Sequence, residues 1–175
     1  MKNIFICFTI LILGCASHYP SKYKNASDKQ LLIYEILNDA LSEKNSEIVR
    51  ESRCSKMIYI NKMYASKFMG SSNENYQEFP LEANDIPTEI NGVKFILKTK
   101  EELQAMADSQ NGNIYSIMLG AIEIKGDSAT IGMDARYTIP TGSKKIFMSG
   151  GGRLLNLKKV NGIWVIGKNR MLWMS

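Results

Sequence analysis

The chain has 175 residues, which is long enough for one domain with its own hydrophobic core. Its 22 Lys and Arg against 17 Asp and Glu give a formal net charge of +5, but the lysines are spread along the chain, with basic doublets only at Lys144-Lys145 and Lys158-Lys159. Because a nucleic-acid-binding protein gathers its positive charge in a stripe, we expect no nucleic-acid partner.

Residues 1–14 have the layout of a secretory signal peptide. Lys2 supplies a positive charge, an apolar run of about ten residues ends at Leu13, and the small Gly14 follows. A membrane-spanning helix requires roughly 20 apolar residues, so this run is too short to be one.

Residues Ile12-Leu13-Gly14-Cys15 resemble the lipobox of bacterial lipoproteins. Ile12, Gly14 and Cys15 match the aliphatic, small and cysteine positions of that motif, whereas Leu13 is bulkier than the Ala or Ser usually found there. The resemblance implies cleavage between Gly14 and Cys15, a diacylglycerol on the Cys15 sulfur and an acyl chain such as palmitate on its amino group. Two or three such chains would bind the protein stably to a lipid bilayer. The alternative is an ordinary secretory signal with a chance cysteine.

Residues 15–26 are then expected to form the lipidated cysteine and a short polar tether, followed by a single domain over residues 27–175. Residues 16–26 span at most about 35 Å when extended, so the domain would lie close to the membrane. Cys7 would leave with the signal peptide, and Cys54 would have no cysteine to pair with. We expect Cys54 to be a small buried apolar side chain.

The first part of the domain is expected to be mainly helical. Ser27 and Gln30 have the spacing of a capping box, and apolar residues recur every four positions from Ile33 to Leu41, which predicts a helix over 28–42. Glu47–Arg53 is expected to be a short strand, and the apolar-rich segment Ser55–Phe68 a second helix.

Shorter elements are expected next. Residues 71–78 are polar and predict a loop, and two prolines limit regular structure over 79–89. Asn91-Gly92 is typical of a turn, Val93–Lys98 of a strand, and the capping box at Thr99 predicts a short helix to about Ala107.

The remaining sequence predicts four strands joined by turns, at residues 114–125, 128–139, 144–160 and 163–173. Asn161-Gly162 is a strong hairpin signal between the last two. Apolar and polar residues alternate strictly over 128–139, so one face of that strand is expected to be buried and the other to meet water or a polar cavity.

Helices followed by strands indicate an α+β fold, with N-terminal helices packed on a C-terminal four-stranded antiparallel meander sheet. The opening helix and the closing hairpin, Leu154–Lys159 and Ile163–Ile166 around Asn161-Gly162, resemble cystatin-like and NTF2-like domains. That resemblance implies a helix on a curved sheet, with a cavity between them in some members. The chain as a whole also resembles small envelope lipoproteins of Gram-negative bacteria.

The glycine run Gly150-Gly151-Gly152 invites a phosphate-loop interpretation. A phosphate loop requires a strand before it and a helix after it, and here strand-like sequence follows. A bulge or bend within a strand is therefore the favoured interpretation.

Asp134 and Arg136 are the candidate ligand-binding pair, because they lie side by side on the polar face of the alternating strand. We expect a solvated ion pair, worth about 0–1 kcal/mol. The alternative is a catalytic or ligand-binding acid in an apolar pocket. Tyr115 and Trp164 are further candidates, the tryptophan as a stacking platform, although core packing is the default for such a ring. Glu123 and Arg153 are further polar groups on neighbouring strands, of the same standing as Tyr115.

No catalytic residue, metal site or cofactor is expected. The single histidine, His18, leaves no Ser/His/Asp set, and no His, Cys, Asp and Glu group has metal-ligand spacing. Three functions stay open: a membrane-anchored, non-enzymatic domain that binds an unknown envelope protein or ligand, a small-molecule binder or isomerase-like enzyme, and an immunity-type protein that covers one partner. Ala16 and Ser17 follow the cysteine, which by resemblance to enteric lipoproteins implies the periplasmic face of the outer membrane.

Overall fold

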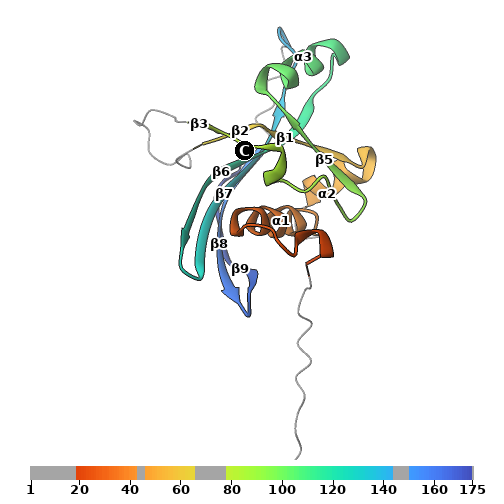
Figure 1. The fold of residues 1–175 in the computed structure, drawn as a ribbon. Helices are drawn as coiled ribbons and strands as arrows, with labels where there is room; N and C mark the ends of the chain where they lie inside the picture. Colours follow the sequence, from red (N-terminus) through yellow and green to blue (C-terminus); the bar gives the residue numbers. More distant parts are fainter. Residues whose placement is uncertain (1–18, 43–45, 66–77, 144–149, 175) are drawn as a thin grey trace, which may run out of the picture.

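The computed structural model describes residues 19–42, 46–65, 78–143 and 150–174, and it has an α+β fold (Figure 1). The helices are α1 Asp28–Ala40, α2 Ser46–Ser55 and α3 Lys100–Gln110, with single 3₁₀ turns at Ser21–Tyr23 and Ala83–Asp85. The strands are β1 Met57–Asn61, β2 Met63–Ala65, β3 Glu78–Pro80, β4 Glu89–Ile90, β5 Val93–Lys98, β6 Ile114–Lys125, β7 Ser128–Thr138, β8 Gly150–Val160 and β9 Ile163–Met174. The predicted signal peptide, the loop over 71–77 and the first part of the third predicted strand lie outside the described residues.

The sheet is larger and more mixed than expected. Strands β6, β7, β8 and β9 do form an antiparallel meander, but β6 also pairs in parallel with β1, and β1 in parallel with β5. The main strand order is β4-β5-β1-β6-β7-β8-β9, with β2 and β3 joined to β6 at the side. The prediction of a four-stranded antiparallel sheet was therefore wrong, because short strands before residue 100 extend it.

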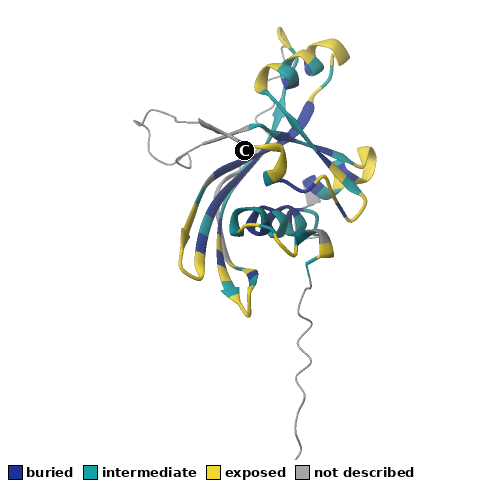
Figure 2. Ribbon diagram, viewed as in Figure 1, coloured by how far each residue is buried: buried dark blue, intermediate teal, exposed yellow. Residues whose placement is uncertain are grey.

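Helix α1 is the element that closes the core. The predicted capping box is present, with the Ser27 hydroxyl accepting from the Gln30 backbone and the Gln30 side chain accepting from the Ser27 backbone. The curved half of the sheet, β6 to β9, bends around this helix (Figure 1). Its buried residues belong to the main core, and Figure 2 colours them dark blue: Leu31, Leu32, Ile33, Ile36, Leu37 and Ala40.

Two predictions between residues 46 and 65 were wrong. The segment expected as a strand is helix α2, whose buried Ile48 and Ser52 lie four positions apart; a polar residue in the buried stripe concealed the helical period. The segment expected as a helix begins with β1, in which Ile58 and Ile60 are buried at period two. Met57 and Tyr59 on its other face are also apolar, and two apolar faces cannot be assigned by periodicity.

Helix α3 lies between β5 and β6 and packs apart from the main core. Its predicted capping box is present at Thr99, and it ends at Asn111, which has a left-handed backbone conformation. Leu103 and Ala107 contact Ile114 of β6 in a small separate cluster, with Tyr59 at its edge.

Residues 19–26 are packed on the domain rather than free. Tyr19, Tyr23 and Ala26 lie against the main core, and the Tyr19 and Tyr23 rings both contact Tyr34 of α1, with centroid distances of 5.9 and 4.8 Å. Residues 19–26, most of the predicted tether over 16–26, therefore belong to the folded domain. Cys54, expected to be buried, is exposed at the end of α2.

Within the described residues, no helix is long and apolar enough to cross a bilayer.

Candidate functional site

The pair Asp134 and Arg136 on β7 is not the solvated ion pair expected. Arg136 Nη2 donates to Asp134 Oδ2, but only 2% of Asp134 is exposed, whereas 42% of the Arg136 side chain is. The other carboxylate oxygen, Oδ1, is buried without a hydrogen-bond partner among the described residues. The prediction was wrong because β7 is buried on both faces from Ile131 to Ala135. The alternation of apolar and polar residues correctly identified the face of β7 in the core, but it wrongly assigned the other face to solvent.

Arg153 of β8 is a second charged group inside the molecule. It lies opposite Met133 of β7, so it projects from the face of the sheet that contacts α1. Its Nη1 donates to Asp39 Oδ2 of α1 at 3.5 Å, and its Nη2 lies 3.8 Å from the Met133 sulfur. Burial lowers the pKa of the guanidinium, and the negative charge of Asp39 opposes that shift. The pair joins α1 to β8, next to the edge strand β9.

Two tyrosines continue this polar region along the same face. Tyr115 of β6 and Tyr137 of β7 are paired across the strands, and their rings meet edge to face at 5.1 Å. The Tyr137 hydroxyl donates to Glu51 of α2 at 3.0 Å and accepts from Arg50 at 3.3 Å. Arg153 thus holds α1 against the strands through Asp39, and Tyr137 holds α2 through Glu51 and Arg50.

Trp164 of β9 has a structural position. Its ring is buried, with 1% of the residue exposed, and its indole N–H donates to Asp28 Oδ1 at 3.1 Å. Lys159 donates to the same oxygen at 2.7 Å and lies 5.5 Å from the centre of the ring. The hydrogen bond from Lys159 is the main reason that the pKa of Asp28 is lowered. In this structure no face of the ring is open to a ligand.

Tyr19 completes the junction between the start of the chain and the last hairpin. Its hydroxyl oxygen accepts from the Trp164 backbone N–H at 2.9 Å. Burial raises the pKa of Tyr19 from 10.0 to about 12. Burial also raises the pKa of Glu35, whose carboxylate is hydrogen-bonded to Tyr19 and repelled by Asp39. The phenol thus connects α1 and β9.

The glycine run forms part of a strand, as predicted. Gly150, Gly151 and Gly152 pair with Arg136, Ala135 and Asp134 of β7. The register between β8 and β9 shifts beside Gly152, which is the expected irregularity. Strand, not helix, follows the run, so it lacks the geometry of a phosphate loop.

The structure thus separates the four candidates. Asp134 and Arg136 project from the outer face of β7, whereas Tyr115 and Trp164 lie on the face that contacts α1, near opposite ends of it. The pairing of Arg153 with Asp39 was not predicted from the sequence, in which Arg153 was given little weight. Its signal is present in the sequence, because Arg153 is in phase with the apolar Leu155 and Leu157, and a charge in an apolar row requires a partner.

No metal-binding group of three or more His, Cys, Asp or Glu side chains occurs among the described residues. Comparison with known proteins gives no assignment: no protein-family model, no curated protein and no solved structure matches this chain. The resemblance to cystatin-like and NTF2-like domains stays a prediction from the sequence.

Proposed function

We propose that this chain is a lipoprotein of the bacterial cell envelope, anchored through Cys15, whose domain binds another envelope protein or component without catalysis. The observation that carries the proposal is the lipobox-like sequence Ile12-Leu13-Gly14-Cys15 directly after a short apolar run. Tyr19, four positions later, is hydrogen-bonded to the backbone of Trp164. A lipidated Cys15 would therefore hold the domain directly on the membrane, on the periplasmic side of the outer membrane in our proposal.

The contacts of the interior polar groups support a role without catalysis. Arg153 contacts Asp39, Tyr137 contacts Glu51 and Arg50, and Trp164 contacts Asp28. Each pair links a strand to a helix, which is a structural use of the side chain.

Expression of the full chain in a Gram-negative host tests the anchor. We expect the mature protein to partition into detergent and its N-terminal peptide to carry the mass of a diacylglycerol and an acyl chain on Cys15. The Cys15→Ser variant should remain uncleaved and carry no such mass. A wild-type protein that is released without lipid would overturn the proposal.

One observation favours the alternative, a small-molecule binder or isomerase-like enzyme. Asp134 is buried and one of its oxygens has no hydrogen-bond partner among the described residues, which is an arrangement that a ligand could complete. Native mass spectrometry of the mature protein tests this. An added mass that disappears on denaturation and is lost in Asp134→Asn would favour the alternative, whereas a bare protein mass would favour the non-enzymatic domain.

A further inference from the structure

The large exposed hydrophobic side chains of the described residues are gathered at one end of the molecule. Three large aliphatic residues are strongly exposed: Ile124 at 41%, Val160 at 52% and Val165 at 48%. Ile124 stands next to the β6–β7 turn, and Val160 and Val165 flank the β8–β9 turn. Single exposed aliphatics are common on soluble proteins, but here all three lie at the tips of two hairpins.

The two hairpin tips lie side by side. The backbone N–H of Lys159 donates to the carbonyl of Asp127, in the β6–β7 turn, at 2.8 Å. Val165 pairs with Lys158 across the β8–β9 hairpin, and Val160 pairs with Ile163. Lys158, Val160 and Val165 consequently lie on one face of the hairpin, opposite the face that carries Trp164.

Tyr19, the first residue that the structure describes, lies at this same end. Tyr19 is hydrogen-bonded to Trp164, two residues beyond the Asn161-Gly162 turn. Only residues 16–18 separate Tyr19 from Cys15, and four chain steps reach at most about 14 Å. A lipid on Cys15 would therefore hold the hairpin tips near the bilayer surface.

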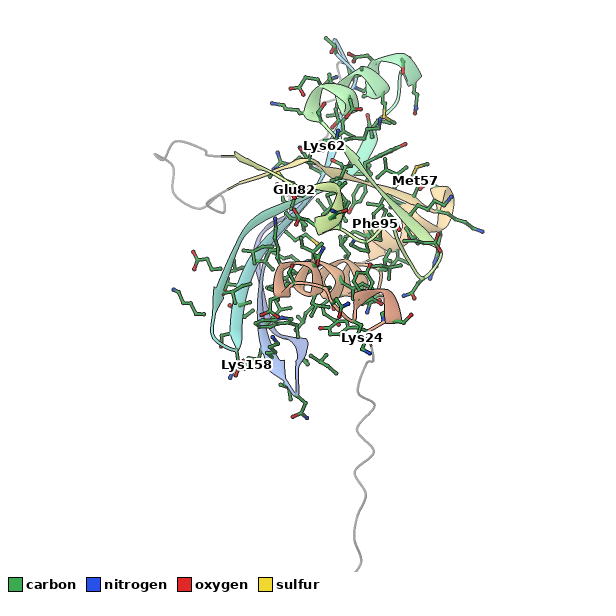
Figure 3. All side chains as sticks on the ribbon, in the orientation of Figure 1. Lys24, Met57, Lys62, Glu82, Phe95 and Lys158 are labelled. Carbon is green, nitrogen blue, oxygen red and sulfur yellow. The ribbon has the colours of Figure 1, made fainter. Side chains whose placement is uncertain are left out.

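The charges at this end match an anionic surface. Lys24, Lys125 and Lys158 are exposed, and Lys24 and Lys158 are both labelled in the lower part of the domain (Figure 3). Among the acidic groups, Asp28 is held by Lys159 at 2.7 Å and Glu123 lies 3.9 Å from Lys125, whereas Asp127 is exposed. Helix α3 lies at the far end of the molecule (Figure 1).

We propose that the tips of the β6–β7 and β8–β9 hairpins form a second contact with the membrane. In this arrangement Val160 and Val165, which share one face of the β8–β9 hairpin, enter the boundary between headgroups and acyl chains of an anionic phospholipid bilayer. Ile124 lies beside them on the opposite face of the tips, and the exposed lysines face the phosphates. This inference rests on the proposed lipid anchor, which brings the tips to the surface. The contact fixes the orientation of the domain, so that α3 points away from the membrane.

A fluorescence measurement on the lipidated mature protein in vesicles tests the contact. Cys54 is exposed and is first replaced by Ser, so that a single new cysteine can be labelled with an environment-sensitive dye. Val165→Cys reports on the tips, and Ala105→Cys, exposed on α3, is the matched control. In vesicles of phosphatidylethanolamine and phosphatidylglycerol, we expect the emission at position 165 to shift to shorter wavelength and to be quenched by lipids with a quencher near the headgroup, with no change at position 105.

The outcomes separate this inference from the anchor. A lipid mass on Cys15 with equal, water-like emission at positions 165 and 105 would overturn the contact while leaving the anchor intact. A protein without lipid on Cys15 would overturn the proposed function itself. A shift at 165 that occurs without vesicles and grows with protein concentration would mean that a second copy of the chain covers the tips, which also overturns the contact. Replacing phosphatidylglycerol by phosphatidylcholine should reduce the shift, and Lys158→Glu should do the same.

Discussion

Asp134 shows how a single residue can have an environment that its strand pattern does not predict. A buried carboxylate requires a cation or hydrogen bonds, because the desolvation of the charge is unfavourable. Arg136 supplies that cation from two positions along the same strand, while its own side chain keeps partial contact with water. The buried Asp134 carboxylate therefore depends on Arg136 for its stability, whereas the partly exposed Arg136 depends less on Asp134.

This asymmetry predicts different effects for the two partners. Arg136→Gln leaves the Asp134 carboxylate buried without a cation and should lower the free energy of unfolding by about 1–3 kcal/mol, below the value for fully buried pairs because Arg136 is partly exposed. Asp134→Asn removes the charge itself and should cost less, at about 1 kcal/mol. Urea unfolding measures both, with Lys125→Gln as an exposed control. Equal losses for the two variants would contradict this account of the pair.

Ionisation of Tyr19 should make the free energy of unfolding depend on pH in the alkaline range. Its pKa is raised from 10.0 to about 12 in the folded protein, so between these values the unfolded chain loses a proton that the folded chain keeps. Tyr19 therefore contributes its full share to the free energy of unfolding below pH 10.0, its pKa in the unfolded chain. That contribution is lost as the pH rises from 10.0 to about 12, its pKa in the folded protein. Because the phenol is partly exposed, the loss should be below the roughly 1.4 kcal/mol per pKa unit that full coupling would give.

The Tyr19→Phe variant tests this contribution. We expect its unfolding midpoint to fall less than that of the wild type between neutral pH and about pH 11. Tyr23 and Tyr34, whose pKa values burial also raises, keep part of the alkaline loss in both proteins. At neutral pH the variant should be less stable by about 1 kcal/mol, since the Trp164 N–H loses its acceptor. Identical alkaline profiles would show that Tyr19 does not titrate as argued.

At the scale of elements, the N-terminal starts of α1 and α3 were easier to predict than α2 and β1, which lie between these two helices in the chain. The Ser27 and Thr99 capping boxes are local patterns whose partners lie three residues apart, and both were confirmed. Helix α2 and strand β1 were assigned the wrong way round, because Ser52 occupies a buried helical position and Met57 and Tyr59 fill the second face of a strand. Their conformations follow from contacts with distant parts of the chain.

The separation of α3 from the main core predicts a local response to loss of its cap. Thr99→Ala removes the hydroxyl that accepts from the Glu102 backbone and should cost about 1 kcal/mol. Leu103 and Ala107 fix α3 in its small cluster, and Gln104 and Asp108 are hydrogen-bonded to residues 139–141. Because none of these contacts involves the main core, the helix should open without it. Hydrogen exchange should therefore accelerate in residues 100–110 and stay unchanged in α1. Faster exchange in both helices would mean that α3 unfolds only with the rest of the domain.

At the scale of the whole molecule, helix α1 packs on the curved sheet β6–β9 and completes the hydrophobic core. Helix α1 contributes six buried apolar residues, and Arg153, Asp28 and Trp164 fix it to β8 and β9 at two separate places. The parallel strands β5 and β1 extend the sheet beyond the region that this helix covers, and α2 packs beside β1. Stability should consequently depend more on α1 than on any other helix.

A cavity variant in α1 measures that dependence. Ile36→Ala removes a fully buried side chain and should lower the free energy of unfolding by about 2–5 kcal/mol, in a single transition for the whole domain. Val160→Ala, at an exposed hairpin tip, should change it by no more than about 0.5 kcal/mol. If the two variants lose similar stability, α1 is not the element that closes the core.

The sequence by itself determined what depends on neighbours a few residues apart. These features are the capping boxes, the hairpin turn at Asn161-Gly162, where both residues have positive φ, and the alternation that identified the core face of β7. The lipobox is of the same local kind, and the lipid anchor stays a prediction made from it. The tertiary structure decided the parallel pairing of β1, the burial of Asp134 and the pairing of Arg153 with Asp39. These contacts join residues far apart in the chain, so no local period or spacing could specify them.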